Sequence, residues 1–134
     1  MLKKSKKIIF FSSQTSVRKK PISLKRIFQN SLPINLEICS GHGDWIIERA
    51  EKDKGKVNWV VLEIRFERVY TIYSKMVFKQ LENLVILAGE AQDILTHCMK
   101  PRVFNEIFVN YPDPPVWEQS QWLLIQTSFL RQVW

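Results

Sequence analysis

The sequence has few of the features that mark membrane-spanning or disulfide-linked proteins. It contains no run of 18 apolar residues, so we expect no transmembrane helix. Two cysteines, Cys39 and Cys98, are too few for a disulfide framework or a zinc site, which indicates a reducing intracellular compartment. The 134 residues, 46% of them apolar, nevertheless suffice for the buried core of one globular domain.

Acidic residues are absent from the first 36 positions, although nine of the 20 Lys and Arg residues lie there. The other eleven basic residues stand among all 13 acidic residues, so the rest of the chain is nearly neutral. Residues 1–22 are therefore predicted to form a basic arm. A disordered, solvated terminus, an organelle transit peptide and a contact with RNA phosphates are the alternatives for this arm. The compartment is accordingly expected to be cytoplasmic or organellar.

A short strand, a glycine turn and a helix follow one another in the middle of the chain. Residues 34–39 are apolar and strand-like, Gly41 and Gly43 follow, and an amphipathic helix is expected from Asp44. Glycine lets the backbone turn sharply and lets a ligand approach without a Cβ in the way. This order is typical of the opening of a nucleotide-binding βαβ unit.

Strands and helices are expected to alternate four times along the chain, which predicts an α/β fold with a parallel sheet and right-handed crossovers. The predicted strands are residues 34–39, 57–63, 84–88 and 104–110. The predicted helices are residues 23–30, 44–50, 65–80, 91–97 and 119–131.

Polar residues recur where the predicted strands end, at Glu37, Glu63, Glu90 and residues 110–113. In parallel sheets ligands bind beyond the carboxyl ends of the strands, so these residues are expected to share one crevice. Glu63 stands 20 residues beyond Gly43, where an acidic residue of a βαβ unit reaches the hydroxyls of a ribose.

Several catalytic and nucleotide-binding motifs are missing. No Gly-Lys-Ser/Thr follows the turn, which argues against a nucleoside triphosphate, and Ile46 occupies the third position of the dinucleotide fingerprint. No Ser/His/Asp set, Cys/His pair or carboxylate pair suited to hydrolysis occurs either. A ligand without phosphates, such as S-adenosylmethionine, fits this turn better than a dinucleotide does.

Four motifs, in order and spacing from about residue 34 to residue 130, resemble those of the tRNA (guanine-N7)-methyltransferases. They are Leu36-Glu37-Ile38 with Gly41-x-Gly43, Leu62-Glu63-Ile64-Arg65-x-x-Arg68-Val69, Asn83-Leu84 to Gly89-x-Ala91, and Asn110-Tyr111-Pro112-Asp113-Pro114. The second and fourth motifs are the more specific ones.

The resemblance implies a Rossmann-like class I methyltransferase fold whose parallel sheet has the strand order 3-2-1-4. Residues 23–134 would then be a partial methyltransferase domain that lacks the last strands, because the chain stops at Trp134. The open edge of the fourth strand is apolar, so a partner chain or self-association is expected to cover it.

The resemblance also implies S-adenosylmethionine as cofactor and tRNA as substrate. The residues it places at the cofactor are Glu37, Gly41 and Gly43 at the methionine end, Glu63 at the ribose with Arg65 steadying the loop after it, Glu90 and Ala91 at the adenine, and Asn110 near the methyl group.

Asn110 and Asp113 are the residues that the resemblance places at the reaction itself. Guanine N7 carries a lone pair and no proton, so the reaction needs orientation and in-line approach more than it needs a base. A carboxylate such as that of Asp113 could instead hold the guanine N1–H and exocyclic amine.

The sequence departs from the family pattern at three places. Cys39 stands where the first glycine usually lies, and Glu90 replaces the usual aspartate. Residues 115–118 are neutral to acidic, whereas the family places basic residues suited to RNA phosphate there. A paralogue that binds cofactor or RNA without catalysis is therefore the alternative. An exocyclic-amine methyltransferase fits less well, because its loop needs an aromatic residue at Val116.

Overall fold

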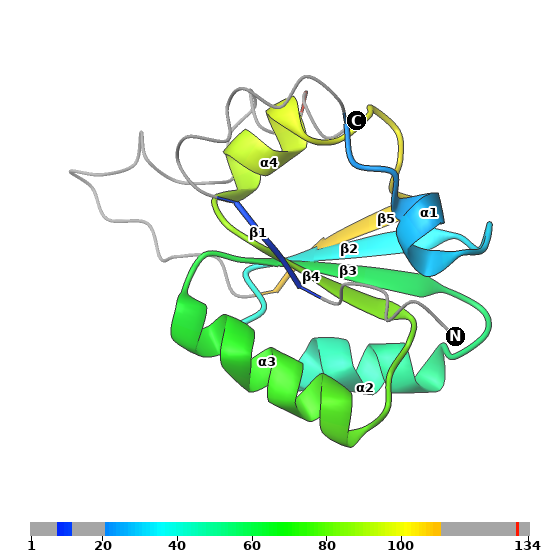
Figure 1. The fold of residues 1–134 in the computed structure, drawn as a ribbon, viewed down its shortest axis with the longest axis vertical. Coiled ribbons are helices and arrows are strands. Elements are labelled where there is room, and N and C mark those ends of the chain that lie inside the picture. The colour runs from blue at the N-terminus through cyan, green and yellow to red at the C-terminus, as the bar shows by residue number, and fades with distance from the viewer. Residues whose placement is uncertain (1–7, 12–20, 111–130, 132–134) are drawn as a thin grey trace.

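The computed structural model describes residues 8–11, 21–110 and 131, which form a parallel sheet with helices on both faces (Figure 1). The strands are β1 (Ile8–Phe10), β2 (Ile34–Ile38), β3 (Asn58–Glu63), β4 (Leu84–Ala88) and β5 (Glu106–Val109). The helices are α1 (Leu24–Phe28), α2 (Asp44–Lys52), α3 (Phe66–Phe78) and α4 (Ala91–His97).

The sheet has the order β1-β4-β3-β2-β5, and every pair of neighbouring strands is parallel. The four strands predicted from the sequence are β2 to β5, and they keep the predicted order 3-2-1-4. The fold is therefore the Rossmann-like α/β arrangement that was predicted, with β1 as an additional strand beside β4.

β1 was not predicted, because its three residues lie in the segment assigned to the basic arm. Ile8, Ile9 and Phe10 pair with residues 86–88 of β4, so this part of the arm belongs to the sheet. A strand this short has no alternation to detect, and it is stabilised by its backbone pairing with β4.

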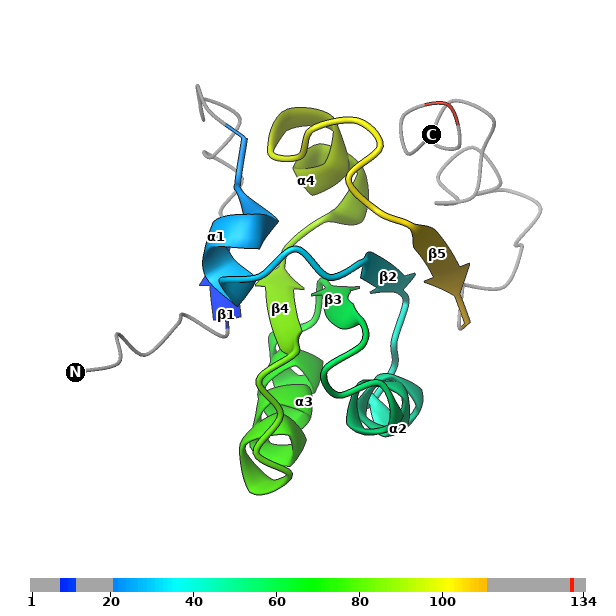
Figure 2. The same ribbon diagram turned by 90° about the vertical axis from the view of Figure 1, so that its right-hand side faces the viewer.

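The central strands β2, β3 and β4 are buried along their whole length, which explains their near-continuous apolar sequences. Figure 2 shows α1 and α4 on one face of the sheet and α2 and α3 on the other. Each face has its own core: Leu36 and Leu62 pack toward α4, whereas Trp59 and Val61 pack toward α2 and α3.

Some boundaries differ from the predicted ones. α3 begins one residue late because Arg65 is extended, and it ends before Gln80, which has a φ of 53°. β5 is shorter than the predicted residues 104–110, although the Asn105 N–H still donates to the Ile34 carbonyl at 2.7 Å. The predicted helix 119–131 lies, apart from residue 131, outside the described residues. None of the described helices is long and apolar enough to cross a membrane.

Candidate functional site

The turn after β2 lies at the carboxyl ends of the strands and has an unusual backbone. Three of its residues adopt the left-handed conformation, Cys39 with a φ of 61°, Gly41 with 59° and Gly43 with 86°. Gly43 directly precedes α2 and lies against α3. A Cβ at this position would lie 2.5 Å from Cγ1 of Ile72. Glycine is therefore required at position 43 both for its conformation and for its packing.

Cys39 adopts the left-handed backbone conformation although it replaces the glycine that is usual at this position. A left-handed conformation costs a residue with a Cβ about 1 kcal/mol relative to glycine, which is why glycine is the usual residue at such a position. The cysteine keeps the turn in the glycine-like conformation, so the substitution leaves the shape of the turn in place.

The Glu63 carboxylate is fixed at the end of β3 by three hydrogen bonds. The backbone N–H groups of Ile64 and Arg65 both donate to its Oε1 at 3.0 Å, and the Ser40 hydroxyl donates to its Oε2 at 3.3 Å. Both Glu63 and Ser40 are buried. The carboxylate is therefore held in one orientation at the position where an acidic residue accepts hydrogen bonds from ribose hydroxyls.

The Glu37 carboxyl group is buried beside it with one oxygen unpaired. In the sheet Glu37 lies between Val61 of β3 and Phe108 of β5, both apolar. The Asn110 side-chain amide donates to Oε1 at 3.0 Å, whereas Oε2 has no hydrogen-bond partner among the described residues. Burial raises the pKa of Glu37 from its usual 4.5 to about 7, the Asn110 bond opposes this rise, and the nearby Glu63 charge adds to it.

Together these groups make a site suited to one kind of ligand. Glu37 and Glu63 lie in rows of the sheet with Val61 and Ala88, which pack toward α2 and α3, so both carboxyl groups are on that side of the sheet. A cationic or N–H donor group would satisfy the free oxygen of Glu37, and hydroxyl donors would suit the fixed oxygens of Glu63. Among the described residues no group of three or more His, Cys, Asp or Glu could hold a metal ion.

The structure brings most of the predicted site residues together. Glu37, Glu63, the glycine turn and Asn110 meet at the carboxyl ends of β2, β3 and β5. Arg65 contributes through its backbone N–H, because its side chain is 62% exposed and lies 3.9 Å from Glu67.

Glu90 and Ala91 are placed at the neighbouring strand end. Glu90 precedes α4 and is exposed, and Ala91 is the first residue of that helix. Both follow Gly89, whose N–H donates to the Glu63 carbonyl at 3.0 Å, so they lie beside the end of β3. Asp113 lies outside the described residues.

Two features of the site were missed from the sequence. Ser40, which is buried and donates to Glu63, was not singled out, although a serine directly before Gly41 of the turn is a usable signal. The bond between Asn110 and Glu37 joins residues 73 positions apart, and no sequence pattern indicates it.

Comparison with known proteins identifies the family. Residues 31–134 match a protein family described as "Putative methyltransferase". A Chlamydia muridarum protein named tRNA (guanine-N(7)-)-methyltransferase is 41% identical over 112 residues, which are 83% of this chain and 50% of that protein. Proteins of the same name from Chlamydia trachomatis serovar D and Lacticaseibacillus casei are 42% identical over 110 residues and 30% identical over 106 residues. These alignments cover 81% and 78% of this chain, and each covers 49% of the relative.

The chain thus spans about half the length of the curated relatives it matches. The matched residues nevertheless include all of β2 to β5, and with them the glycine turn, both buried carboxyl groups and Asn110. The chain belongs to this methyltransferase family.

Proposed function

We propose that the chain binds S-adenosylmethionine and methylates guanine N7 in tRNA, the reaction for which its relatives are named. The observation that carries the proposal is the buried, unpaired Oε2 of Glu37 beside the fixed carboxylate of Glu63. A buried acceptor without a partner costs free energy, so a site built this way fits a ligand that brings a donor to it.

The residues of the site fit the parts of this cofactor in order. Glu37 would accept hydrogen bonds from the cofactor's ammonium group, and the turn with Gly41 and Gly43 would let the methionine part approach the backbone. Glu63 would accept the ribose hydroxyls. The adenine would lie by the start of α4, at Glu90 and Ala91.

When bound, the cofactor supplies a methyl group that is activated by attachment to a sulfonium. Because guanine N7 carries a lone pair and no proton, the chain needs only to hold the base in line with the methyl group. Asn110 is well placed to help, since its amide is anchored to Glu37 at the end of β5. Asp113, three residues further on, would hold the guanine N1–H and exocyclic amine.

Substrate and compartment are part of the same proposal. The relatives that are named for tRNA methylation support tRNA as the substrate of this chain. An intracellular compartment, cytoplasmic or organellar, follows because tRNA is found there. The basic residues of positions 1–22 would then contact RNA phosphates, and tRNA affinity would fall steeply with salt.

Calorimetric titration with S-adenosylmethionine, followed by methyl transfer to bulk tRNA, tests the proposal. We expect binding, with N7-methylguanosine as the product. Glu63→Gln should weaken binding roughly tenfold or more, because a hydrogen bond to a charged acceptor is lost. Glu67→Gln is the matched control, since Glu67 is exposed and four positions away. The absence of cofactor binding by the parent chain would refute the proposal.

A cofactor-binding relative without catalysis is the second candidate function. It is favoured by residues 115–118, which are neutral to acidic where basic residues would contact RNA. Binding of the cofactor without transfer of its methyl group to any tRNA would support this second function over the first.

A further inference from the structure

Exposed apolar side chains gather on one element of the structure. All seven large hydrophobic residues that are exposed in the described part of the chain lie on α3 or next to it. They are Phe10, Ile64, Phe66, Tyr70, Tyr73, Val77 and Phe78. Ile64 directly follows Glu63 and belongs with the site described above. Of the other six, five lie on α3 and Phe10 lies on β1 beside it, and such a concentration indicates an interaction surface, because soluble proteins rarely expose such a patch without use.

Four of these residues form a stripe along α3, which we call the α3 seam: Phe66, Tyr70, Tyr73 and Val77. Their spacing of four, three and four residues places them on one side of the helix. The seam adjoins the inward stripe of Val69, Ile72 and Met76, which packs against the sheet. α3 therefore carries two apolar stripes, of which only one is covered in the described structure.

Phe10 extends the seam at its amino-terminal end. The Phe10 ring lies 6.0 Å from Phe66 and 6.4 Å from Tyr70, measured between ring centroids. β1 is the outer strand of the sheet beyond β4, so the seam lies on the side of α3 under this edge. Figure 2 shows α2 on the other side of α3, away from this edge.

Two lysines at the carboxyl end of α3 bind carboxylates of α2, on the side away from the β1 edge. Lys75 donates to Asp44 of α2 at 2.6 Å, and Lys79 donates to Glu51 of α2 at 3.3 Å. At the start of the helix Arg65 and Glu67 lie 3.9 Å apart and offset each other. The seam residues themselves carry no charge, which favours an apolar protein surface over the phosphates of RNA.

We propose that the α3 seam is the contact between two copies of this chain, paired as antiparallel helices about a two-fold axis. The four seam positions are spaced symmetrically about a centre between Thr71 and Ile72. Antiparallel pairing about that centre sets Phe66 opposite Val77 of the partner subunit and Tyr70 opposite Tyr73 of the partner subunit. A two-fold contact needs a self-complementary patch of this kind. Here the Phe66 ring packs against the smaller side chain of Val77 of the partner subunit, and the two tyrosines pack against each other.

The size of the patch agrees with a dimer. An aromatic side chain has roughly 200 Å² of surface. Phe10, Phe66 and Tyr70 are 50%, 57% and 56% exposed and Tyr73 is 37% exposed, so together they present on the order of 400 Å². A standard interface buries about 800 Å² per partner, of which somewhat more than half is apolar. The exposed aromatic area is therefore close to the apolar part of such an interface.

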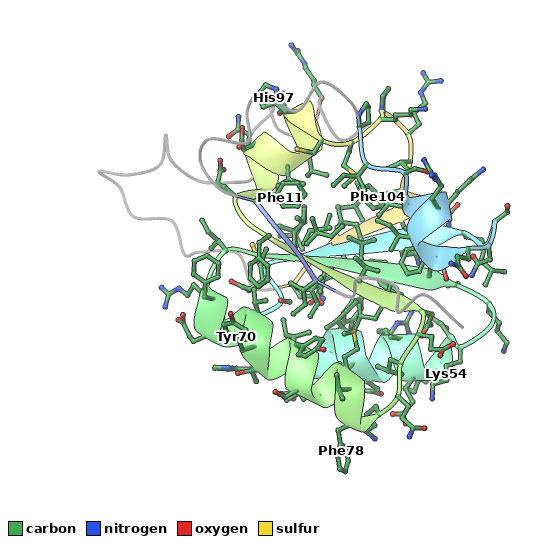
Figure 3. All side chains as sticks on the ribbon, viewed as in Figure 1. Phe11, Lys54, Tyr70, Phe78, His97 and Phe104 are labelled. Atoms are coloured by element: carbon green, nitrogen blue, oxygen red, sulfur yellow. The ribbon has the colours of Figure 1, made fainter. Side chains whose placement is uncertain are left out.

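The first test measures the mass of the 134-residue chain in solution over a wide range of concentration, by sedimentation equilibrium. We expect a monomer–dimer equilibrium. Tyr70→Glu should raise the dissociation constant roughly tenfold or more, because it puts a charge at the centre of the contact. Phe78→Glu is the matched control, since Phe78 lies on the same helix but points away from the sheet at its end (Figure 3). Circular dichroism of both variants checks that each is folded.

The second test fixes the register by crosslinking. A mixture of Phe66→Cys and Val77→Cys proteins should be joined by a short bifunctional maleimide, and neither protein alone should be joined to itself. In the antiparallel pair each position lies about 16 Å along the helix axis from its own copy, too far for a short bridge. Peptide mapping, with the parent chain as control, separates these links from any through Cys39 or Cys98.

Three outcomes would overturn the proposal. A monomer at all concentrations excludes the dimer, and self-linking of each cysteine variant with none in the mixture indicates parallel helices. If instead Tyr70→Glu leaves the mass unchanged but weakens tRNA binding while Phe78→Glu does not, the seam is an RNA contact. The absence of cofactor binding by the parent chain would refute the proposed function, whereas the proposal of a dimer does not depend on it.

Discussion

Replacing Glu37 by glutamine should stabilise the ligand-free protein in a strictly pH-dependent way. The Glu37 carboxyl group is buried between apolar neighbours and has a pKa of about 7 instead of 4.5. Between these two values the unfolded chain has lost its proton and the folded chain keeps it. The raised pKa therefore contributes stability that is fully present below pH 4.5 and lost as the pH rises through 7.

The magnitude follows from the size of the shift. One pKa unit corresponds to about 1.4 kcal/mol, so the difference between 4.5 and about 7 is worth about 3 kcal/mol of unfolding free energy. Glutamine keeps an oxygen that accepts from Asn110 and presents a neutral donor in place of Oε2, as the protonated acid does. Near pH 8 the variant should therefore be more stable by about 3 kcal/mol, or roughly 10 °C in melting temperature.

Urea unfolding of both proteins at about pH 5 and about pH 8 measures this difference. Near pH 5 the difference should shrink to about 1 kcal/mol, because the folded chain keeps its proton and the pH lies only about half a unit above the pKa of the unfolded chain. The reasoning would be refuted by an equal change in unfolding free energy at both pH values, since that would mean a packing effect without titration. The variant should also bind S-adenosylmethionine more weakly, because the charge for its ammonium group is gone.

Further predictions concern the turn, its neighbours and the proton on Glu37. Cys39→Gly should raise the unfolding free energy by about 1 kcal/mol, because the position is left-handed; a destabilised variant in urea would contradict this. Gly43→Ala should lower it by about 2 kcal/mol or more, and its loss combined with Ile72→Ala should be smaller than the sum of the two single losses; additive losses would show that the 2.5 Å contact is not the cause. Ser40→Ala should weaken cofactor binding roughly threefold to tenfold by titration calorimetry, while an unchanged affinity would mean that the backbone alone orients Glu63. Cofactor binding near pH 7 should release a proton from Glu37, seen as a binding enthalpy that depends on the buffer; the same enthalpy in all buffers would argue against it.

The central strands could be predicted because their sequences leave little choice. Residues 58–63 and 84–88 are apolar almost throughout, and a buried parallel strand is the element that needs such a sequence. The glycine turn and Glu63 were predictable for a related reason, since their separation along the chain is fixed by the length of one βαβ unit.

The remaining features depend on contacts that no local pattern encodes. β1 exists because β4 offers it an edge, and its three residues alone do not indicate a strand. The protonation of Glu37 depends on Val61 and Phe108, which are brought beside it only by the sheet register. Arg65 contributes through its backbone N–H, and the type of its side chain does not indicate that contact.

The interaction of Lys75 with the glycine turn has a consequence for local opening. The Lys75 ammonium group donates to the His42 carbonyl at 3.0 Å as well as to Asp44, and Ile72 lies against Gly43 one turn of α3 earlier. The turn and α3 are thus fastened at two points and form one cooperative unit for local unfolding. Amide hydrogens of residues 40–44 should therefore exchange with solvent in step with those of α3, and cofactor should slow exchange in the whole helix.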